Sequence, residues 1–582
     1  MTSDPPRRSD ALATLAALSL GFRSRYLRSE QVVAQLRAWA NAWPDMLTLR
    51  TLAQTPEGRP IVVAILGDES APAVWVDANM HAGELCGTHV ALGILEDLLA
   101  LRLGAPPSHL GIPDAIAPRL RELTAFICPR VSPDGAEAVL TDGRYVRSLP
   151  RDGRIGQSAP RWVHRDVDGD GLAQLMRVED AAGEWVSLPE MPAVLVPRQI
   201  DDTGPFYALY PEGHIEGWDG FTIPEATYLS DTQTDLNRNF PYGWQPEPAQ
   251  AGAGDYPCSE PESRALVDFA GVHPNIFVWL NLHTFGGVFI RPLGDAPDAK
   301  MDAHDLGVFR QIEAWNTEAT GYPTVSGYHE FLYEPDKPLR GDLTEWAYHQ
   351  RGALAYVAEL WDLPRQAGIE VRRPFIDTFQ RMTRADLARI AQWDRDHNAS
   401  RAVRPWRRFE HPQLGPVELG GIDPRFGLQN PPPERLDELC RAHARAFLRV
   451  ASLPPIVRLD HVRVVRLDAE VSRVEIVVRN HGYLATYGAH AARALPWNEP
   501  LQARLACHDG VALVAGDARQ SLGHLEGWGR GAHDSSYALS VSRSRGNVQA
   551  RRAQWVVRGA GEVTVSVSSV RVGRVERRAR VG

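Results

Sequence analysis

The sequence predicts an α/β domain, with a mixed and largely parallel sheet flanked by helices, followed by a C-terminal all-β sandwich. The first observation is a series of short apolar runs that alternate with amphipathic segments up to about residue 400. The second is the alternation of apolar and polar residues after residue 456, as in HVRVVRLDAEVSRVEIVVRN. The third is the length of 582 residues, which is too great for one hydrophobic core.

The elements of the first domain follow from local patterns. Residues 29–49 carry apolar side chains at helical spacing, with Ser29 as a candidate N-cap and Pro44 as a stop signal. Residues 87–103 are also expected to be helical. Buried strands are expected wherever a short run is almost continuously apolar, which occurs at 61–67, 73–80, 123–131, 275–284 and 353–361.

Changes in these patterns set the predicted domain boundaries. Residues 1–25 are expected to form an N-terminal leader or packed segment, and residues 26–405 the α/β domain. A stretch from about 148 to 230 is rich in Pro, Gly, Asp and Arg and is interpreted as an insertion of loops and short hairpins. Residues 406–455 are expected to be a linker and helix, and residues 456–582 the β-sandwich.

Composition and charge indicate which binding partners and which cellular compartment to expect. The formal net charge of −9 argues against nucleic acid as the main partner. The apolar run from Ala11 to Phe22 is too short to cross a membrane and lacks a following cleavage site, which favours a packed segment over a secretion signal. The five cysteines include no CxxC pair and fit a reducing compartment. We therefore expect a cytoplasmic protein without nucleic-acid or membrane partners; secretion and the oligomeric state stay open.

A histidine and a glutamate stand close together directly after the second expected strand. Residues 79–85 read NMHAGEL, which places His81 and Glu84 three positions apart. Two histidines and one glutamate form one of the ligand sets of catalytic zinc sites, but an HxxE pair alone is also common in solvated turns. His283, at the end of a later buried strand, is the candidate third ligand, because open α/β sheets build their sites at strand ends.

Glu359 lies near the end of the last expected strand of the α/β domain, in ALAYVAELW. A carboxylate in an apolar strand is costly unless it is paired or functional. Two interpretations are open at this point. It could form a salt bridge with one of the many arginines, or it could act as a general base on a metal-activated water molecule.

Nine short motifs occur in one order: EGRPI, HAGE, PRVSPDGAE, RYVR, DLNRNF, SEPES, NLHT, DLTEW and AELWD. Over about residues 26–365 this series resembles the carboxypeptidase A-like zinc metallocarboxypeptidases, whose fold it also implies. The resemblance implies one Zn²⁺ per chain, bound by His81, Glu84 and His283. It also implies that Glu359 is the catalytic glutamate.

The resemblance extends to residues that would contact the substrate. Asn237 and Arg238 match the pair that holds the terminal carboxylate of a peptide, which a planar guanidinium can bind through two hydrogen bonds. Arg147 matches the arginine that stabilises the oxyanion. Tyr333 is the nearest candidate for the mobile tyrosine of the family, and Tyr328 is the second.

The side-chain preference is not determined by the sequence. Asp342 and Thr344 fall near the expected base of the specificity pocket, and Arg340 is close to both. Asp342 would favour a basic terminal side chain and Arg340 an acidic one. Gly83 stands where pancreatic-type members often carry an arginine, so one outer subsite contact is expected to be missing. The insertion at 148–230 is expected to rim the cleft.

The predicted function is that of a zinc-dependent exopeptidase. It would hydrolyse the C-terminal peptide bond of a peptide with a free carboxylate, with Glu359 as general base. One alternative is an amidase or peptidase that acts on cell-wall or γ-linked peptides with the same residues. The other is an inert peptidase fold that acts as a binding protein through the β-sandwich.

A second possible metal site lies in the insertion. The stretch DVDGDG spaces Asp166, Asp168 and Asp170 as in the first half of an EF-hand loop, with Gly171 at the sixth place. The twelfth place is Arg177, where a calcium loop needs a glutamate. A tight acidic turn is therefore favoured over bound Ca²⁺.

Overall fold

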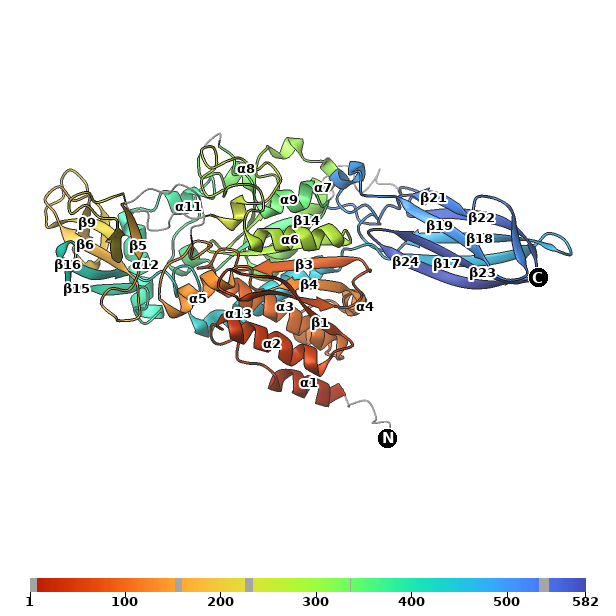
Figure 1. Ribbon diagram of the computed structural model, residues 1–582, viewed down its shortest axis with the longest axis horizontal. Coiled ribbons are helices and arrows are strands. Elements are labelled where there is room, and N and C mark those ends of the chain that lie inside the picture. The colour runs from red at the N-terminus through yellow and green to blue at the C-terminus, as the bar shows by residue number, and fades with distance from the viewer. Residues whose placement is uncertain (1–7, 152–159, 226–233, 335–336, 533–543) are drawn as a thin grey trace.

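The computed structural model describes residues 8–151, 160–225, 234–334, 337–532 and 544–582. Three parts follow one another along its long axis: a sheet-containing module at one end, a central α/β domain, and an all-β domain at the other end (Figure 1). No helix in the described ranges combines the length and the apolar character that a membrane crossing requires.

The central domain is built on an eight-stranded mixed sheet in the order β1-β2-β4-β3-β11-β14-β12-β13. The four middle strands, β4, β3, β11 and β14, run parallel to one another. The predicted fold class is therefore confirmed. The strands are β1 (Leu47–Gln54), β2 (Pro60–Leu66), β3 (Ala73–Ala78), β4 (Thr124–Cys128), β11 (Ile276–Thr284), β12 (Val288–Arg291), β13 (Thr324–Ser326) and β14 (Leu354–Leu360).

Helices cover the sheet, and one of them comes from far along the chain. Helix α13 (Leu436–Ala451) packs against α3 (Cys86–Arg102) and α7 (Ala303–Thr320), within the same hydrophobic core. Every residue of β3 and β11 is buried, because neighbouring strands and helices enclose both. The long apolar runs in the sequence reflect this burial on both faces of the sheet.

The first long helix is shorter than the apolar pattern predicted. Helix α2 (Ser29–Ala42) ends two residues before Pro44, and β1 starts at Leu47 inside the range expected to be helical. A proline disfavours the helical conformation of the residue before it, which explains the early end. Ser29 is the first helical residue and not the N-cap, and its hydroxyl donates to the carbonyl of Pro133 at 2.9 Å.

The described part of the N-terminal segment packs on the central domain. Helix α1 (Arg8–Ala17) leads to Phe22, which is fully buried and contacts Trp39 edge to face. Arg23 forms ion pairs with Glu96 at 2.7 Å and Asp97 at 3.2 Å on α3. These contacts hold the segment against the surface of the α/β domain.

Strands of the insertion and of the expected linker form one structural module, which corrects the expectation of a linker, whereas the short hairpins expected in the insertion are present. Strands from both segments share a six-stranded sheet in the order β15-β16-β6-β9-β7-β8. Residues 406–455 are thus no linker, because their strands complete the hydrogen bonding of the insertion. The strands are β6 (Leu175–Glu179), β7 (Trp185–Leu188), β8 (Met191–Pro197), β9 (Phe206–Pro211), β15 (Val403–His411) and β16 (Gly415–Ile422), beside a separate antiparallel pair of β5 (Arg161–His164) and β10 (Gly213–Glu216).

Two four-stranded antiparallel sheets form the C-terminal domain, in the orders β17-β18-β22-β20 and β21-β19-β23-β24. Inward-facing residues such as Val474, Ile476 and Val478 are fully buried, as the alternating pattern requires. The strands are β17 (Val457–Arg466), β18 (Val471–Asn480), β19 (Leu501–Cys507), β20 (Val511–Ala515), β21 (Arg519–Gly523), β22 (Ala550–Gly559), β23 (Gly561–Ser569) and β24 (Gly573–Val581).

Candidate metal centre and its cavity

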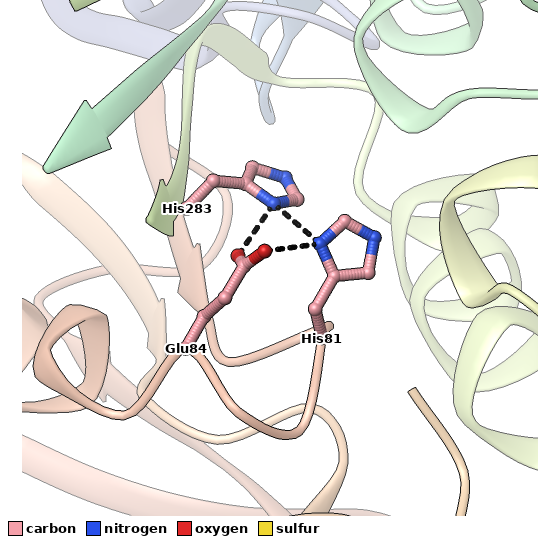
Figure 2. A group of neighbouring side chains, drawn as sticks. All are labelled: His81, Glu84 and His283. Atoms are coloured by element: carbon pink, nitrogen blue, oxygen red, sulfur yellow. Dashed lines mark hydrogen bonds and ion pairs between the residues drawn. The ribbon is translucent and has the colours of Figure 1, made fainter. Parts of the chain in front are cut away.

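Three candidate metal ligands meet at one edge of the central sheet. His81 and Glu84 lie in the turn between β3 and α3, and His283 lies near the end of β11. Because β3 and β11 are parallel neighbours, both strands end at the same edge of the sheet. The three side chains therefore point toward one another although the chain segments are far apart in sequence (Figure 2).

The ligand atoms are close enough to share one ion. Nδ1 of His81 lies 2.7 Å from one oxygen of Glu84, and Nδ1 of His283 lies 2.9 Å from the other. The two Nδ1 atoms are 3.0 Å apart. Two ring nitrogens that face each other beside a carboxylate need a cation or a proton between them, and two histidines with a glutamate are a known ligand set for zinc. The residues present therefore fit a zinc ion.

The electrostatics of the cluster favour an ionised carboxylate. All three residues are buried, with at most 4% of each exposed. Burial by itself would raise the pKa of Glu84, but the neighbouring His81 and His283 lower it below its ordinary value. A carboxylate that stays ionised in a buried site is suited to bind a cation.

The turn that carries His81 and Glu84 is held from two sides. Asn79, with a positive φ of 56°, donates its amide to the carbonyls of His81 at 2.8 Å and Ala82 at 3.0 Å. Asn430 donates to the carbonyl of Gly83 at 2.7 Å and accepts from the backbone N–H of Cys86 at 2.9 Å. Both ends of the turn are thus fixed before any metal binds.

A glutamine occupies the space beside Gly83, where the sequence suggested that a contact is missing. A Cβ atom at Gly83 would lie 2.7 Å from the amide oxygen of Gln429 and 3.4 Å from the ring of Tyr145. Gln429 in turn donates to the hydroxyl of Tyr145 at 3.0 Å. A side chain at residue 83 would therefore have to displace the end of the Gln429 side chain.

Glu359 stands beside the metal ligands on β14, the neighbour of β11. Its Cα pairs in register with that of His283, and its half-buried side chain lines the same cavity as both histidines. Burial raises the pKa of Glu359 to about 8. A carboxyl group with a pKa near neutrality can accept a proton and return it.

One cavity connects these residues with the expected substrate contacts. Nine of the ten predicted site residues line it, and the tenth, Glu84, lies behind the two histidines. The lining includes no residue from 148–151 or 160–225, so the described part of the insertion does not line this cavity as expected. The predicted residues in the lining are His81, Arg147, Asn237, Arg238, His283, Tyr333, Asp342, Thr344 and Glu359.

Arg147 is held between two carboxylates at the metal centre. Its Nη1 group donates to Glu84 at 3.2 Å and its Nε group to Asp235 at 3.2 Å. Burial would lower the pKa of Arg147, but Asp235 and Glu84 raise it, so the guanidinium keeps its charge. It therefore provides a fixed positive charge beside the candidate metal site.

Asn237 and Arg238 enter the cavity from a short helical turn, η3 (Leu236–Arg238). The amide oxygen of Asn237 accepts from the backbone N–H of Leu343 at 2.9 Å, and its amide nitrogen has no hydrogen-bond partner within the described ranges. Arg238 donates to the carbonyl of Asn237 at 2.6 Å and is 8% exposed. Both side chains can offer hydrogen-bond donors to an anionic group in the cavity.

Of the two tyrosines considered for a mobile role, Tyr333 lines the cavity and Tyr328 is not part of its lining. The ring of Tyr333 is 46% exposed and contacts Phe331 edge to face at 6.0 Å. Tyr328 contacts His329, with their ring centroids 5.3 Å apart. Tyr333 is thus the tyrosine that could move over a ligand.

Two acidic side chains, Asp342 and Glu345, line the cavity together with Arg291. Asp342 caps α9 (Leu343–His349) by accepting from the backbone N–H of Glu345 at 3.0 Å, and Glu345 also lines the cavity. Burial and Glu345 raise the pKa of Asp342 to about 7. Arg340 points elsewhere and donates to Asp295 at 3.0 Å. Thr344 is 6% exposed and its hydroxyl has no hydrogen-bond partner among the described residues.

Two further groups of residues could in principle hold a cation. One contains Asp295, Glu345 and His349; the other contains Asp166, Asp168 and Glu212.

In the acidic turn, Asp166 accepts from the backbone N–H groups of Gly169 at 2.7 Å and Gly171 at 2.8 Å. Arg407 binds Asp168 at 3.1 Å and also contacts Asp170. The carboxylates of the turn thus have partners within the chain. Arg177, at the twelfth place, donates to Glu418 at 2.7 Å.

Sequence reasoning missed several residues behind the ligands. Asp235 accepts from or shares a proton with Nε2 of His81 at 3.1 Å, and its signal was its place in DLNRNF, two residues before Asn237. Asp77 is a fully buried carboxylate inside an apolar strand, and such a costly placement by itself indicates a structural or functional role. Asn430 left no signal, because nothing local relates it to the metal turn.

Models of two protein families match different parts of the chain. The model of the zinc carboxypeptidase family matches residues 32–167 and 225–380, just over half of the chain. The model of a domain of unknown function (DUF8731) matches residues 457–580. The gap between the two segments matched by the first family, 168–224, contains strands β6 to β9 and β10 of the insertion, whereas β5 lies inside the match.

Individual relatives are distant. Carboxypeptidase B of Bos taurus is 30% identical over 154 residues, which cover 23% of this chain and 34% of the relative. Carboxypeptidase A4 of Mus musculus is 20% identical over 340 residues, which cover 57% of this chain and 62% of the relative. The chain thus spans less than two thirds of these relatives. The crystal structure of carboxypeptidase A from Helicoverpa armigera is 19% identical, with a TM-score of 0.38 and coverage of 61% of this chain and 70% of that one.

Proposed function

Because this chain belongs to the zinc carboxypeptidase family, we propose that it is a zinc-dependent exopeptidase that removes the C-terminal residue of a peptide. The observation that carries the proposal is the convergence of His81, Glu84 and His283 within 3.0 Å in a cavity that Glu359 also lines. A zinc ion bound there would polarise the scissile carbonyl and make a water molecule more acidic.

The remaining steps fall to side chains of this chain. Glu359, with its pKa raised to about 8 by burial, is placed to accept a proton from water and to return it to the leaving amine. The charged guanidinium of Arg147 would donate to the oxyanion that develops on the carbonyl oxygen. Its pairing with Glu84 and Asp235 fixes its position before substrate binds.

The exopeptidase character would come from Asn237 and Arg238. Their free donors can bind the terminal carboxylate of a peptide, which fixes the distance between the chain end and the scissile bond. Tyr333 would contact the substrate from the exposed side of the cavity. A peptide with a blocked C-terminus lacks the anionic group that these donors recognise.

We expect Asp342 and Glu345 to favour a basic terminal side chain, because Arg291, which also lines the cavity, is already paired with Asp298 and Glu313. Asp342 and Glu345 both line the cavity, whereas Arg340 is paired with Asp295. A lysine or arginine side chain would relieve the repulsion between the two carboxylates, and an acidic side chain would add to it. In a panel of blocked dipeptides, those that end in Arg or Lys should give the highest kcat/KM. Asp342→Asn should reduce that preference and Arg340→Ala should not.

The central test uses Glu359→Gln. Metal analysis should find one zinc per chain in the wild type and in this variant, because Glu359 is not a ligand. Turnover should fall by about a hundredfold or more, since the general base is lost. A matched control, His81→Ala, should lose zinc and activity together. Full activity of Glu359→Gln would refute the mechanism.

The two alternatives make different predictions in the same assays. An amidase on cell-wall or γ-linked peptides would use the same residues, so blocked dipeptides must be compared with muropeptides. An inert binding protein would show no turnover with either substrate class. We also propose a cytoplasmic location, which the five cysteines support because all are free thiols; fractionation of cells would test it.

A further inference from the structure

A chain of hydrogen bonds runs from His283 away from the metal centre and ends on a buried carboxylate. Nε2 of His283 contacts the amide oxygen of Asn281, and the amide nitrogen of Asn281 donates to Oδ1 of Asp77. The exposed fractions of Asp77, Asn281 and His283 are 0%, 0% and 2%. Solvent therefore cannot replace any of these partners.

Two tryptophans fix the orientation of the carboxylate. The indole N–H groups of Trp75 and Trp279 both donate to Oδ2 of Asp77, at 2.7 Å and 2.6 Å. An indole nitrogen can only donate, so this oxygen can only accept. The other carboxylate oxygen is left for Asn281.

The topology of the sheet brings these side chains together. Asp77 on β3 and Asn281 on β11 are directly paired in the parallel register. Alternate residues of a strand point to the same face, which aligns Trp75 with Asp77 and Trp279 with Asn281 and His283. The chain of hydrogen bonds from Asp77 through Asn281 to His283, called the relay below, is thus one row of side chains across two neighbouring strands.

The donors and acceptors in this row have only one consistent arrangement. A carboxylate accepts, so Asn281 must present its amide nitrogen to Asp77 and its oxygen to His283. The Nε2 atom of His283 must then carry the proton, which leaves the lone pair on Nδ1, the atom that faces Glu84 and His81. We propose that Asp77, acting through Asn281, is a positioning residue that holds His283 in the tautomer able to bind the metal through Nδ1.

The variant Asp77→Asn tests the direction of the relay. The tryptophans would still require an acceptor, so the new amide at position 77 would turn its nitrogen toward Asn281. Asn281 would then turn its oxygen to position 77 and its nitrogen to His283. Nε2 would have to accept, and the proton would move to Nδ1, where it competes with the metal. We expect zinc affinity, measured by competition with a chelator, to fall about 10- to 100-fold.

The nitrogen chemical shifts of His283 in the metal-free protein give a readout independent of activity. In the wild type Nε2 should carry a proton, and in Asp77→Asn Nε2 should be the nitrogen without one. The double variant Asp77→Asn with Asn281→Asp reverses the pair: the new amide donates to the new carboxylate, which accepts from Nε2–H. Both the tautomer and the zinc affinity should return to near the wild-type state.

A matched control is Asp97→Asn, which neutralises another buried carboxylate, on α3, that pairs with Arg23. Its zinc affinity should equal that of the wild type. The inference is wrong if folded Asp77→Asn keeps the proton on Nε2, or if the double variant recovers neither property. It rests on the proposed zinc site. If the wild type bound no zinc, the proposed function would fail, whereas the spectra of the metal-free protein would still decide the relay.

Discussion

Removal of the Arg238 side chain should weaken only the recognition of a free C-terminus. One of its nitrogens already donates to the carbonyl of Asn237 at 2.6 Å, so two donor groups remain for a carboxylate. Hydrogen bonds to a charged group each contribute about 1.5–3 kcal/mol. Arg238 is only 8% exposed, so water screens these bonds weakly. Arg238→Ala should therefore cost about 3 kcal/mol, or roughly a hundredfold in kcat/KM.

The assay compares each blocked dipeptide with its C-terminal amide. For the wild type the amide should be the far poorer substrate, and Arg238→Ala should lower kcat/KM on the free acid while leaving the amide nearly unchanged. Arg340→Ala serves as a control, because its guanidinium is engaged by Asp295 outside the cavity lining. An equal loss on the acid and the amide would show that Arg238 supports the fold of the site and does not read the carboxylate.

Four further outcomes are expected. Burial raises the pKa of Asp97 to about 7, above its unfolded value of about 3.9, so the native state binds more protons than the unfolded state in this range. The unfolding temperature of the wild type should therefore decrease as the pH increases from 4 to 7, and Asp97→Asn should make this decrease smaller. Arg571→Met should destabilise the protein by about 2–4 kcal/mol in urea unfolding, because a fully buried guanidinium that donates to the carbonyls of Ile276 and Tyr487 at 2.8 and 2.9 Å joins the β-sandwich to β11. Asn430→Ala should weaken zinc binding about tenfold, since it frees the backbone on both sides of Glu84 while Asn79 still holds the His81 side of the turn; a Gln429→Ala control should not weaken it. Added Ca²⁺ should leave the unfolding temperature unchanged, because Asp168 and Asp170 already pair with Arg407 and Asp166 accepts from the backbone; a rise would show a calcium site.

The sequence could predict those parts of the site that depend on a local pattern, namely which residues stand at the ends of buried strands. His81 and Glu84 follow a buried strand directly, and His283 and Glu359 close two others, so strand ends and residue types together pointed to one edge of a sheet. The family model confirms the resemblance that assigned the ligands to a zinc carboxypeptidase. Strand runs of the central sheet were also visible, because burial on both faces leaves continuous apolar segments.

Other expectations failed where the outcome depends on a distant segment. The insertion was interpreted as loops and short hairpins that rim the cleft, and residues 406–455 as a linker and helix, yet strands of the two share one sheet and none of these strands lines the cavity. In neither segment do apolar and polar residues alternate regularly enough to predict which distant strand it pairs with. The paired strands are far apart in the chain, as the hydrogen bond between Arg177 and Glu418 shows, which joins residues 241 positions apart. The choice between Asp342 and Arg340 was equally open, because only the fold turns Arg340 to Asp295.

The amino-acid sequence by itself determined which residue types stand at the ends of which strands, and therefore the chemistry that the site can offer. Only the tertiary structure decided which atoms face the metal, because hydrogen-bond direction depends on neighbours brought in from other strands. Asp77 and Asn281 illustrate this: each is a single polar residue in an apolar run, and their roles appear only when parallel pairing sets them side by side. Local pattern specifies donors and ligands, whereas packing specifies their orientation.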